Sequence, residues 1–123
     1  MAAISNMAAS IEFLQLASSG KARVVFDRCV HPGFTHHNIY FKGDRESLLT
    51  AMEENAKQFP NKIYEVLRAL EDGELTTVHG KVVLGDKTYG VIHIFRFKDG
   101  KIIEAWEASQ EDLNNSPNEN GLF

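Results

Sequence analysis

The chain has 123 residues, of which 43% are hydrophobic and 24% are charged, proportions typical of one globular domain. Its formal net charge of −4 and the lack of a Lys- or Arg-rich run argue against nucleic-acid binding. The single cysteine, Cys29, excludes an internal disulfide and a cysteine-based metal cluster. No stretch approaches the ~20 apolar residues of a transmembrane helix, and the N-terminus lacks the basic start of a signal peptide. We therefore expect one cytoplasmic domain over residues 1–123.

Three helices are expected in the first half of the chain. Apolar residues at helical spacing predict one over about 5–18 and a second over about 21–30, with Gly20 as the C-terminal cap of the first. Pro32 ends the second, because the residue before a proline avoids the helical region. Asp44 is a suitable N-cap for the third. The buried stripe of this third helix is expected to consist of Leu48, Leu49, Met52, Ala56 and Phe59.

The second half of the chain is predicted to be strand. Four runs separated by Asp-Gly or Gly-Asp turns read as antiparallel strands over 62–70, 75–84, 89–97 and 101–109. The segment 34–38 is long enough only for a short edge strand or loop. Helices followed by a meander predict an α+β fold. The helices must cover the inner face of a curled sheet, which predicts a cone with a pocket.

The turn at 85–86 sets the register of the middle strands. As a two-residue loop it pairs Val78 with His93 and sends His79 to the outer face. The orientation of the strand 62–70 stays open, because both of its faces contain a charged residue.

The last hairpin allows two registers. A two-residue loop at 99–100 would pair His93 with Trp106, whereas a three-residue loop with Gly100 as a left-handed bulge would pair His93 with Ala105. A slip of one residue exchanges the two faces of a strand. The register can therefore be judged by where it places the polar side chains.

The three-residue register leaves the inner face apolar except for His93 and Glu107, which would lie diagonally across the two strands. Diagonal neighbours have Cα atoms roughly 7–8 Å apart, which leaves room for a small molecule. A carboxylate and an imidazole on an apolar face are costly unless they pair or take part in chemistry, so this register is preferred. The apolar residues expected to line the site are Val91, Phe95, Phe97 and Ile103.

The same register predicts an outer face too apolar to remain in water. Its apolar residues are Ile92, Ile94, Ile102 and Trp106, beside Arg96 and Glu104. We therefore expect a homodimer through this convex face, with Ile92, Ile94 and Trp106 in the contact.

Two adjacent histidines, His36 and His37, precede Asn38 in the loop after the edge strand. In an extended segment they would point in opposite directions. The sequence lacks His-x-His and His-x-x-x-His, so no metal site is expected. One of the two histidines should lie at the pocket mouth and the other should be solvated or cap a turn.

Several local motifs point to a known family. The chain contains FRFKDGKI at 95–102, EAWE at 104–107, HPGF at 31–34 and HN at 37–38. With the order of elements, they resemble the SnoaL-like polyketide cyclase group of the nuclear-transport-factor-like superfamily. The tail at 115–121 resembles that of a bacterial subgroup named for a predicted aldol-condensation activity.

The resemblance implies roles for two residues. The family's acid/base residue follows the tryptophan and matches Glu107, and its histidine partner, fourteen residues earlier, matches His93. The family usually has Asp where this chain has Glu107. The extra methylene moves the carboxylate by roughly an ångström, a displacement that can change a rate by on the order of 10²-fold. The substrate is therefore left open.

Two functions fit these residues. The first is cofactor-free acid/base catalysis on a small hydrophobic carbonyl compound, by aldol-type cyclisation or isomerisation. Glu107, its pKa raised by burial, would be the base, His93 would bind the enolate oxygen, and His37 with Asn38 would fix the polar end of the substrate. The alternative is a non-catalytic small-ligand-binding domain, in which Glu107 and His93 only satisfy each other. Neither function calls for a cofactor.

Overall fold

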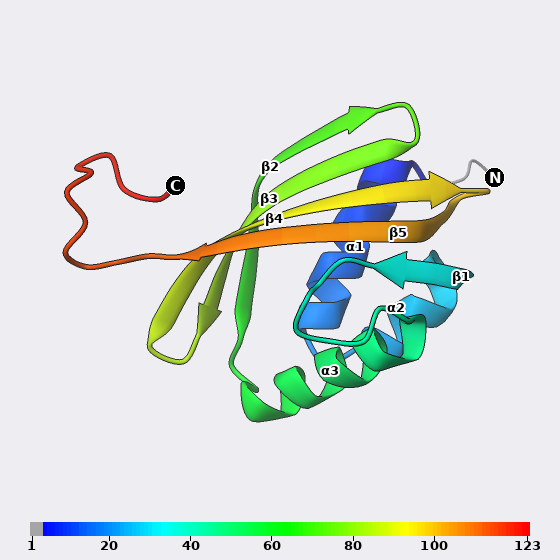
Figure 1. The fold of residues 1–123 in the computed structure, drawn as a ribbon, viewed down its shortest axis with the longest axis horizontal. Helices are drawn as coiled ribbons and strands as arrows, with labels where there is room; N and C mark the ends of the chain where they lie inside the picture. Colours follow the sequence, from blue (N-terminus) through cyan, green and yellow to red (C-terminus); the bar gives the residue numbers. More distant parts are fainter. Residues whose placement is uncertain (1–3) are drawn as a thin grey trace.

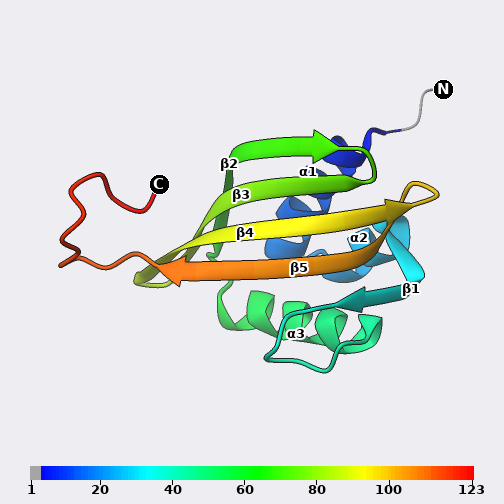
Figure 2. The same ribbon diagram turned by 45° about the horizontal axis from the view of Figure 1, so that its top comes forward.

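The computed structural model describes residues 4–123, so the first three residues of the predicted domain lie outside the described range. The elements, in chain order, are α1 (Asn6–Ser18), α2 (Ala22–Cys29), β1 (Val30–His36), α3 (Arg45–Gln58), β2 (Ile63–Asp72), β3 (Leu75–Leu84), β4 (Lys87–Lys98) and β5 (Lys101–Glu111). The sheet has the order β1-β5-β4-β3-β2. The three helices lie on its inner side (Figures 1 and 2). The predicted α+β fold is confirmed.

The helix ends follow the capping signals in the sequence. The Ser5 side chain accepts a hydrogen bond from the Ala8 N–H, and the Asp44 side chain accepts one from Ser47 at the start of α3. The helix predicted to reach residue 30 ends at Cys29. Beyond it the chain runs straight into β1, which is longer than expected and pairs in parallel with β5.

The helices are attached to the sheet by aromatic packing. The ring of Phe13 on α1 lies 5.3 Å from that of Phe26 on α2 and 5.5 Å from that of Phe95 on β4. All three side chains are almost completely buried. Next to them the hydroxyl groups of Ser10 and Thr76 are also buried and hydrogen-bond at 2.7 Å. These contacts hold α1 across one end of the sheet and leave the opposite end of the cone open.

The predicted turn of the last hairpin is wrong. Lys98 pairs with Lys101, so the loop has two residues, Asp99 and Gly100, rather than three. Both have positive φ, 52° and 78°, as a type I′ turn requires, and this turn matches the right-handed twist of the strands.

A β-bulge then shifts the register. Arg96 pairs with Glu104 and Phe97 with Ile102, which leaves Ile103 without a partner. The bulge exchanges the faces predicted for two neighbours. Ile102, expected on the outer face, is completely buried, and Ile103, expected on the pocket wall, is displaced from it.

Beyond the bulge, His93 lies directly opposite Glu107, not opposite Ala105 as predicted. The two residues still share one face, because turn and bulge together shift the register by an even number of residues. Trp106 pairs with Ile94 on the other face. The predicted separation of faces therefore holds at this site although the predicted pairing does not.

The register of β3 is confirmed, since Val78 pairs with His93. The open orientation of β2 is explained by a second bulge. Val66 pairs with Gly80 but Arg68 pairs with His79, so Leu67 is the extra residue. Glu65 pairs with Lys81 and Arg68 pairs with His79, so these two charged residues both lie on the outer face although they are three positions apart, which no regular alternation can reproduce.

The C-terminal tail runs on beyond the end of β5 and then bends back toward the sheet (Figure 1). A Cβ atom at Gly90 would lie 3.2 Å from Leu122 and 3.4 Å from Phe123. The Lys81 ammonium lies 5.2 Å from the centre of the Phe123 ring. The end of the tail therefore contacts the convex side and does not close the pocket.

Candidate functional site

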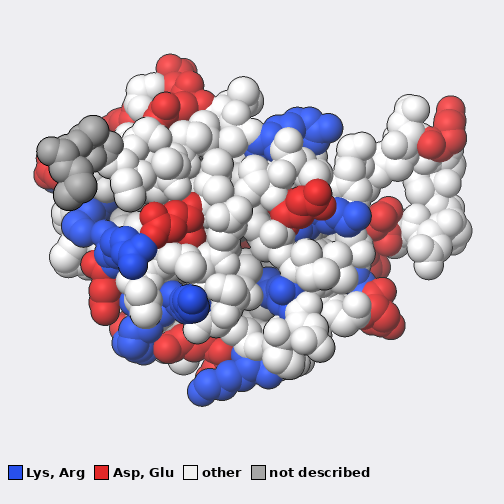
Figure 3. Space-filling model, turned by 180° about the vertical axis from the view of Figure 1, so that it is seen from behind, with Lys and Arg blue, Asp and Glu red and all other residues white. Residues whose placement is uncertain are grey.

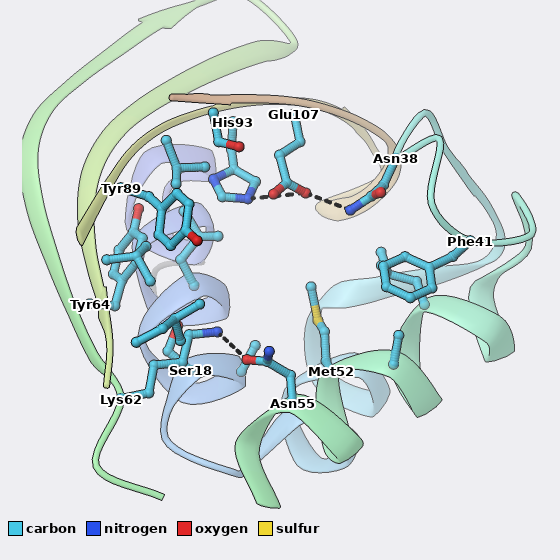
Figure 4. Close-up of a pocket in the computed structure, with 18 residues that line it drawn as sticks. Ser18, Asn38, Phe41, Met52, Asn55, Lys62, Tyr64, Tyr89, His93 and Glu107 are labelled. Atoms are coloured by element: carbon cyan, nitrogen blue, oxygen red, sulfur yellow. Dashed lines mark hydrogen bonds and ion pairs between the residues drawn. The ribbon is translucent and has the colours of Figure 1, made fainter. Parts of the chain in front are cut away.

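A cavity of about 270 Å³ opens between the inner face of the sheet and the helices α1 and α3 (Figure 4). Its apolar walls are formed by Leu14, Ala17, Phe41, Leu48, Ala51, Met52, Val82, Leu84 and Val91. Its polar lining consists of Ser18, Asn38, Asn55, Lys62, Tyr64, Tyr89, His93, Glu107 and Ser109. An apolar cavity with a few convergent polar groups is the usual form of a small-molecule site.

Glu107 and His93 face each other on neighbouring strands at one end of the cavity. The Nε2 atom of His93 lies 3.8 Å from Oε1 of Glu107, too far for a hydrogen bond and close enough for a shared contact with a ligand atom. The His93 side chain is 12% exposed and that of Glu107 is 33% exposed. The imidazole is therefore buried in the wall, whereas the carboxylate lies at the rim.

Asn38 holds the Glu107 carboxylate in place. Its Nδ2 donates to Oε1 of Glu107 at 3.0 Å, and its Oδ1 accepts from the Tyr40 N–H at 3.1 Å. The backbone N–H of Asn38 in turn donates to Nδ1 of His36 at 3.2 Å. The buried His36 ring also bonds the Lys42 carbonyl through Nε2, at 2.8 Å. Since a carbonyl only accepts, the His36 proton belongs on Nε2, and this neutral ring fixes the loop.

His37 points away from the cavity. Its Nε2 lies 2.7 Å from Glu104, and its ring stacks on Trp106 at 5.2 Å. Both partners belong to the outer face of β5. His37 reaches this face because adjacent residues of an extended segment point in opposite directions and its neighbour His36 points inward. The predicted contact of His37 with a substrate is therefore not supported by its position.

The His93 imidazole is neutral near pH 7. Burial lowers its pKa, the Glu107 charge opposes this and the Lys62 charge adds to it. Nδ1 is buried and has no hydrogen-bond partner among the described residues. A proton on Nε2 faces both the Glu107 carboxylate and the cavity. His93 can therefore donate a hydrogen bond to a ligand oxygen without being charged.

The lowered pKa of His93 predicts a pH effect on stability. The unfolded chain takes up a proton at His93 near pH 6.5, whereas the native chain resists it to lower pH. The contribution of neutral His93 to the free energy of unfolding is therefore complete above about pH 6.5. It is lost as the pH falls below this value, by at most about 1.4 kcal/mol per pH unit. Urea unfolding at pH 7.5 and 5.5 should show a smaller loss for His93→Gln than for the parent. His79→Gln, on the outer face, should retain the parent's loss, and equal losses in all three would contradict the assignment.

Two residues that the sequence did not reveal, Tyr64 and Lys62, come from β2 and the turn before it. The Tyr64 ring lies directly over Gly80, where a Cβ atom would be 2.6 Å from the phenol oxygen. Burial raises the pKa of Tyr64 to about 12, so it remains a neutral phenol. The bulge in β2 hid both residues, and a glycine on an inner strand face was the one signal that a ring would pack there.

The predicted site residues are therefore divided by the structure. Glu107, His93, Asn38 and Val91 line the cavity. Phe95 and Phe97 do not, because they lie deeper in the core with 1% and 3% of their surface exposed. The Phe95 ring instead supports the His93 ring, stacked at 5.8 Å. Ile103 is displaced by the bulge, and His37 lies on the outer face.

Neither a metal centre nor a membrane helix is found in the part of the chain that the structure describes. Residues 4–123 contain no group of three His, Cys, Asp or Glu side chains that could hold a metal ion. None of the described helices is long and apolar enough to span a membrane. On the face shown in Figure 3, positive and negative side chains are interspersed and form no continuous basic stripe.

The sequence matches no protein-family model and no curated protein. Solved structures do match. AclR from Streptomyces galilaeus, described as a proposed hydroxylase, is 16% identical, with a TM-score of 0.74 over 85% of this chain and 88% of its own. A proposed polyketide cyclase from Bacillus cereus is 22% identical, with a TM-score of 0.73 over 85% of this chain and 74% of its own.

An NTF2-like protein from Cytophaga hutchinsonii is 14% identical, with a TM-score of 0.74 over 89% of this chain and 93% of its own. Identities this low show the fold and leave the activity open. The chain thus has the nuclear-transport-factor-like fold, in common with proteins described as polyketide cyclases.

Proposed function

We propose that the chain is a cofactor-free acid/base catalyst that acts on a small hydrophobic carbonyl compound, by aldol-type cyclisation or isomerisation. The observation that supports this most is the setting of Glu107. Its Oε1 is held at 3.0 Å by the Asn38 amide and lies 3.8 Å from a neutral imidazole, at the rim of a mainly apolar cavity. Proteins described as polyketide cyclases use the same fold.

The chemistry follows from these positions. Glu107 takes a proton from the carbon next to a carbonyl, and the electron pair of that C–H bond moves to the carbonyl oxygen. The Nε2–H of His93 donates a hydrogen bond to this enolate oxygen. In a cyclisation the enolate carbon then attacks a second carbonyl of the same molecule. The protonated Glu107 returns its proton to the new alkoxide, and the apolar walls hold the chain of the substrate in a folded shape.

The competing function is ligand binding without chemistry. One third of the Glu107 side chain is exposed, so water reaches the carboxylate, and its hydrogen bond to Asn38 satisfies it without a substrate. In that case Glu107, His93 and Asn38 only orient a polar group of the ligand.

Cyclisation of 1-phenylhexane-1,5-dione separates the two functions. Its aldol product loses water to give a conjugated enone, which can be followed by absorbance. The proposed catalyst should accelerate enone formation in proportion to protein concentration. A binding protein should shift the NMR signals of cavity residues with the same diketone and leave the rate at its background value.

We further propose that the chain forms a homodimer through its outer sheet face. Ile92 on this face is 45% exposed, whereas Trp106 is already covered in part by His37 and by Arg96, 5.7 Å from the indole centre. Ile92→Glu should therefore convert a dimer to a monomer in sedimentation velocity. Val24→Glu, at an exposed position on α2, should leave the dimer intact. A parent chain that sediments as a monomer at micromolar concentration would contradict the proposal.

A further inference from the structure

The cavity has a second polar end. Figure 4 shows Lys62 and Asn55 across the cavity from Glu107 and His93. The Lys62 ammonium donates to Oδ1 of Asn55 at 2.9 Å. Asn55 lies in the last turns of α3, and the Lys62 N–H bonds the Phe59 carbonyl in the turn that follows this helix. Both side chains are therefore held by the same helix end.

Lys62 is the sole lysine or arginine among the described residues that line the cavity. Its hydrogen bond goes to a neutral amide, and an ammonium has two further donors. Burial lowers the pKa of Lys62, and the Glu107 charge opposes this shift. A partly buried cation without an anion beside it is costly. The structure thus holds a positive charge in a place where a bound anion would stabilise it.

We propose that this end of the cavity binds the carboxylate of a keto acid, so that Lys62 selects anionic over neutral carbonyl ligands. The inference rests on the proposed function, because a ligand held there by its carboxylate directs its carbonyl toward His93 and the adjacent carbon toward Glu107. The negative charge of Glu107 disfavours the reverse orientation. The apolar walls between the two ends, among them Met52 and Val82, contact the hydrocarbon part.

Calorimetric titration with 4-oxo-4-phenylbutanoate and with its primary amide tests this inference. The two ligands share the ketone and the ring and differ in charge. The parent chain should bind the acid about tenfold to hundredfold more tightly than the amide, as expected for a charge-assisted hydrogen bond. Lys62→Met should lose this preference, and Lys62→Arg should keep most of it. Lys57→Met removes an exposed charge two residues beyond Asn55 and should bind both ligands like the parent.

Equal affinity of the parent for acid and amide would overturn the proposal, as would an unchanged preference in Lys62→Met. Binding of the amide by Lys62→Met serves as the control for folding. Loss of both ligands in a Lys62→Met variant that melts like the parent would also overturn the proposal. The proposed catalysis is tested separately with the neutral diketone. Failure of the diketone to cyclise, with the acid preference intact, would overturn the catalytic function and leave the carboxylate site standing.

Discussion

Replacing Glu107 with glutamine should lower the rate of diketone cyclisation by about 10²–10⁴-fold, the usual contribution of a general acid/base. Glutamine keeps the length of the side chain and an oxygen that can accept from Asn38, 3.0 Å away in the parent. It cannot accept the carbon-bound proton. Affinity for the diketone should therefore change little, and the loss should appear in kcat rather than in KM.

Glu104→Gln is the matched control for this variant. Glu104 lies on the same strand as Glu107, but its side chain bonds His37 on the outer face. The same chemical change at this position should leave the rate close to that of the parent. A Glu107→Gln variant as active as Glu104→Gln would exclude Glu107 as the base.

Truncating Phe13 to alanine should destabilise the fold by about 3–5 kcal/mol, a large share of the stability of a domain of this size. Phe13 is 2% exposed and contacts the rings of Phe26 and Phe95. Its loss leaves a cavity where α1, α2 and β4 meet. Because the Phe95 ring also supports His93, ligand affinity should fall as well.

Urea unfolding followed by circular dichroism measures this effect. Tyr40→Ala provides a comparison, since Tyr40 is aromatic but 84% exposed, and its truncation should change stability by less than about 0.5 kcal/mol. Equal stabilities of the two variants would show that Phe13 is not central to the core.

Much of the fold follows from local signals in the sequence. Asp44 caps α3, and the Gly85-Asp86 turn sets the pairing of Val78 with His93. These features depend on residues a few positions apart, which the sequence displays directly. The number and order of elements could be predicted for the same reason.

The two bulges could not be predicted, because they depend on packing between distant segments. The extra residue in β5, Ile103, allows its neighbour Ile102 to enter the core beside Val30 of β1. The extra residue in β2 is Leu67. Each bulge exchanges faces for part of a strand. Ile103 was therefore misplaced in the site, and Lys62 and Tyr64 were missed.

The two central residues of the site could be predicted from the sequence. His93 and Glu107 share a face in any register of the right parity, so polarity alone identified them. The contact of Asn38 with Glu107 joins residues 69 positions apart, and the sequence shows only that Asn38 lies in a polar loop. The depth of Phe95 and Phe97 below the cavity depends on where α1 crosses the sheet, which no local pattern reports.

The most direct test of the proposed function is solvent deuterium exchange into the α-carbon of a bound ketone. With 1-tetralone in D₂O, proton NMR follows the loss of the α-CH₂ signal and needs no knowledge of the natural substrate. We expect the parent chain and Glu104→Gln to catalyse this exchange, and Glu107→Gln to leave it at the background rate. Tetralone that shifts the NMR signals of Val91 and His93 while its α-protons exchange only at the background rate would contradict the proposed function, and the pocket would then be one that binds without catalysis.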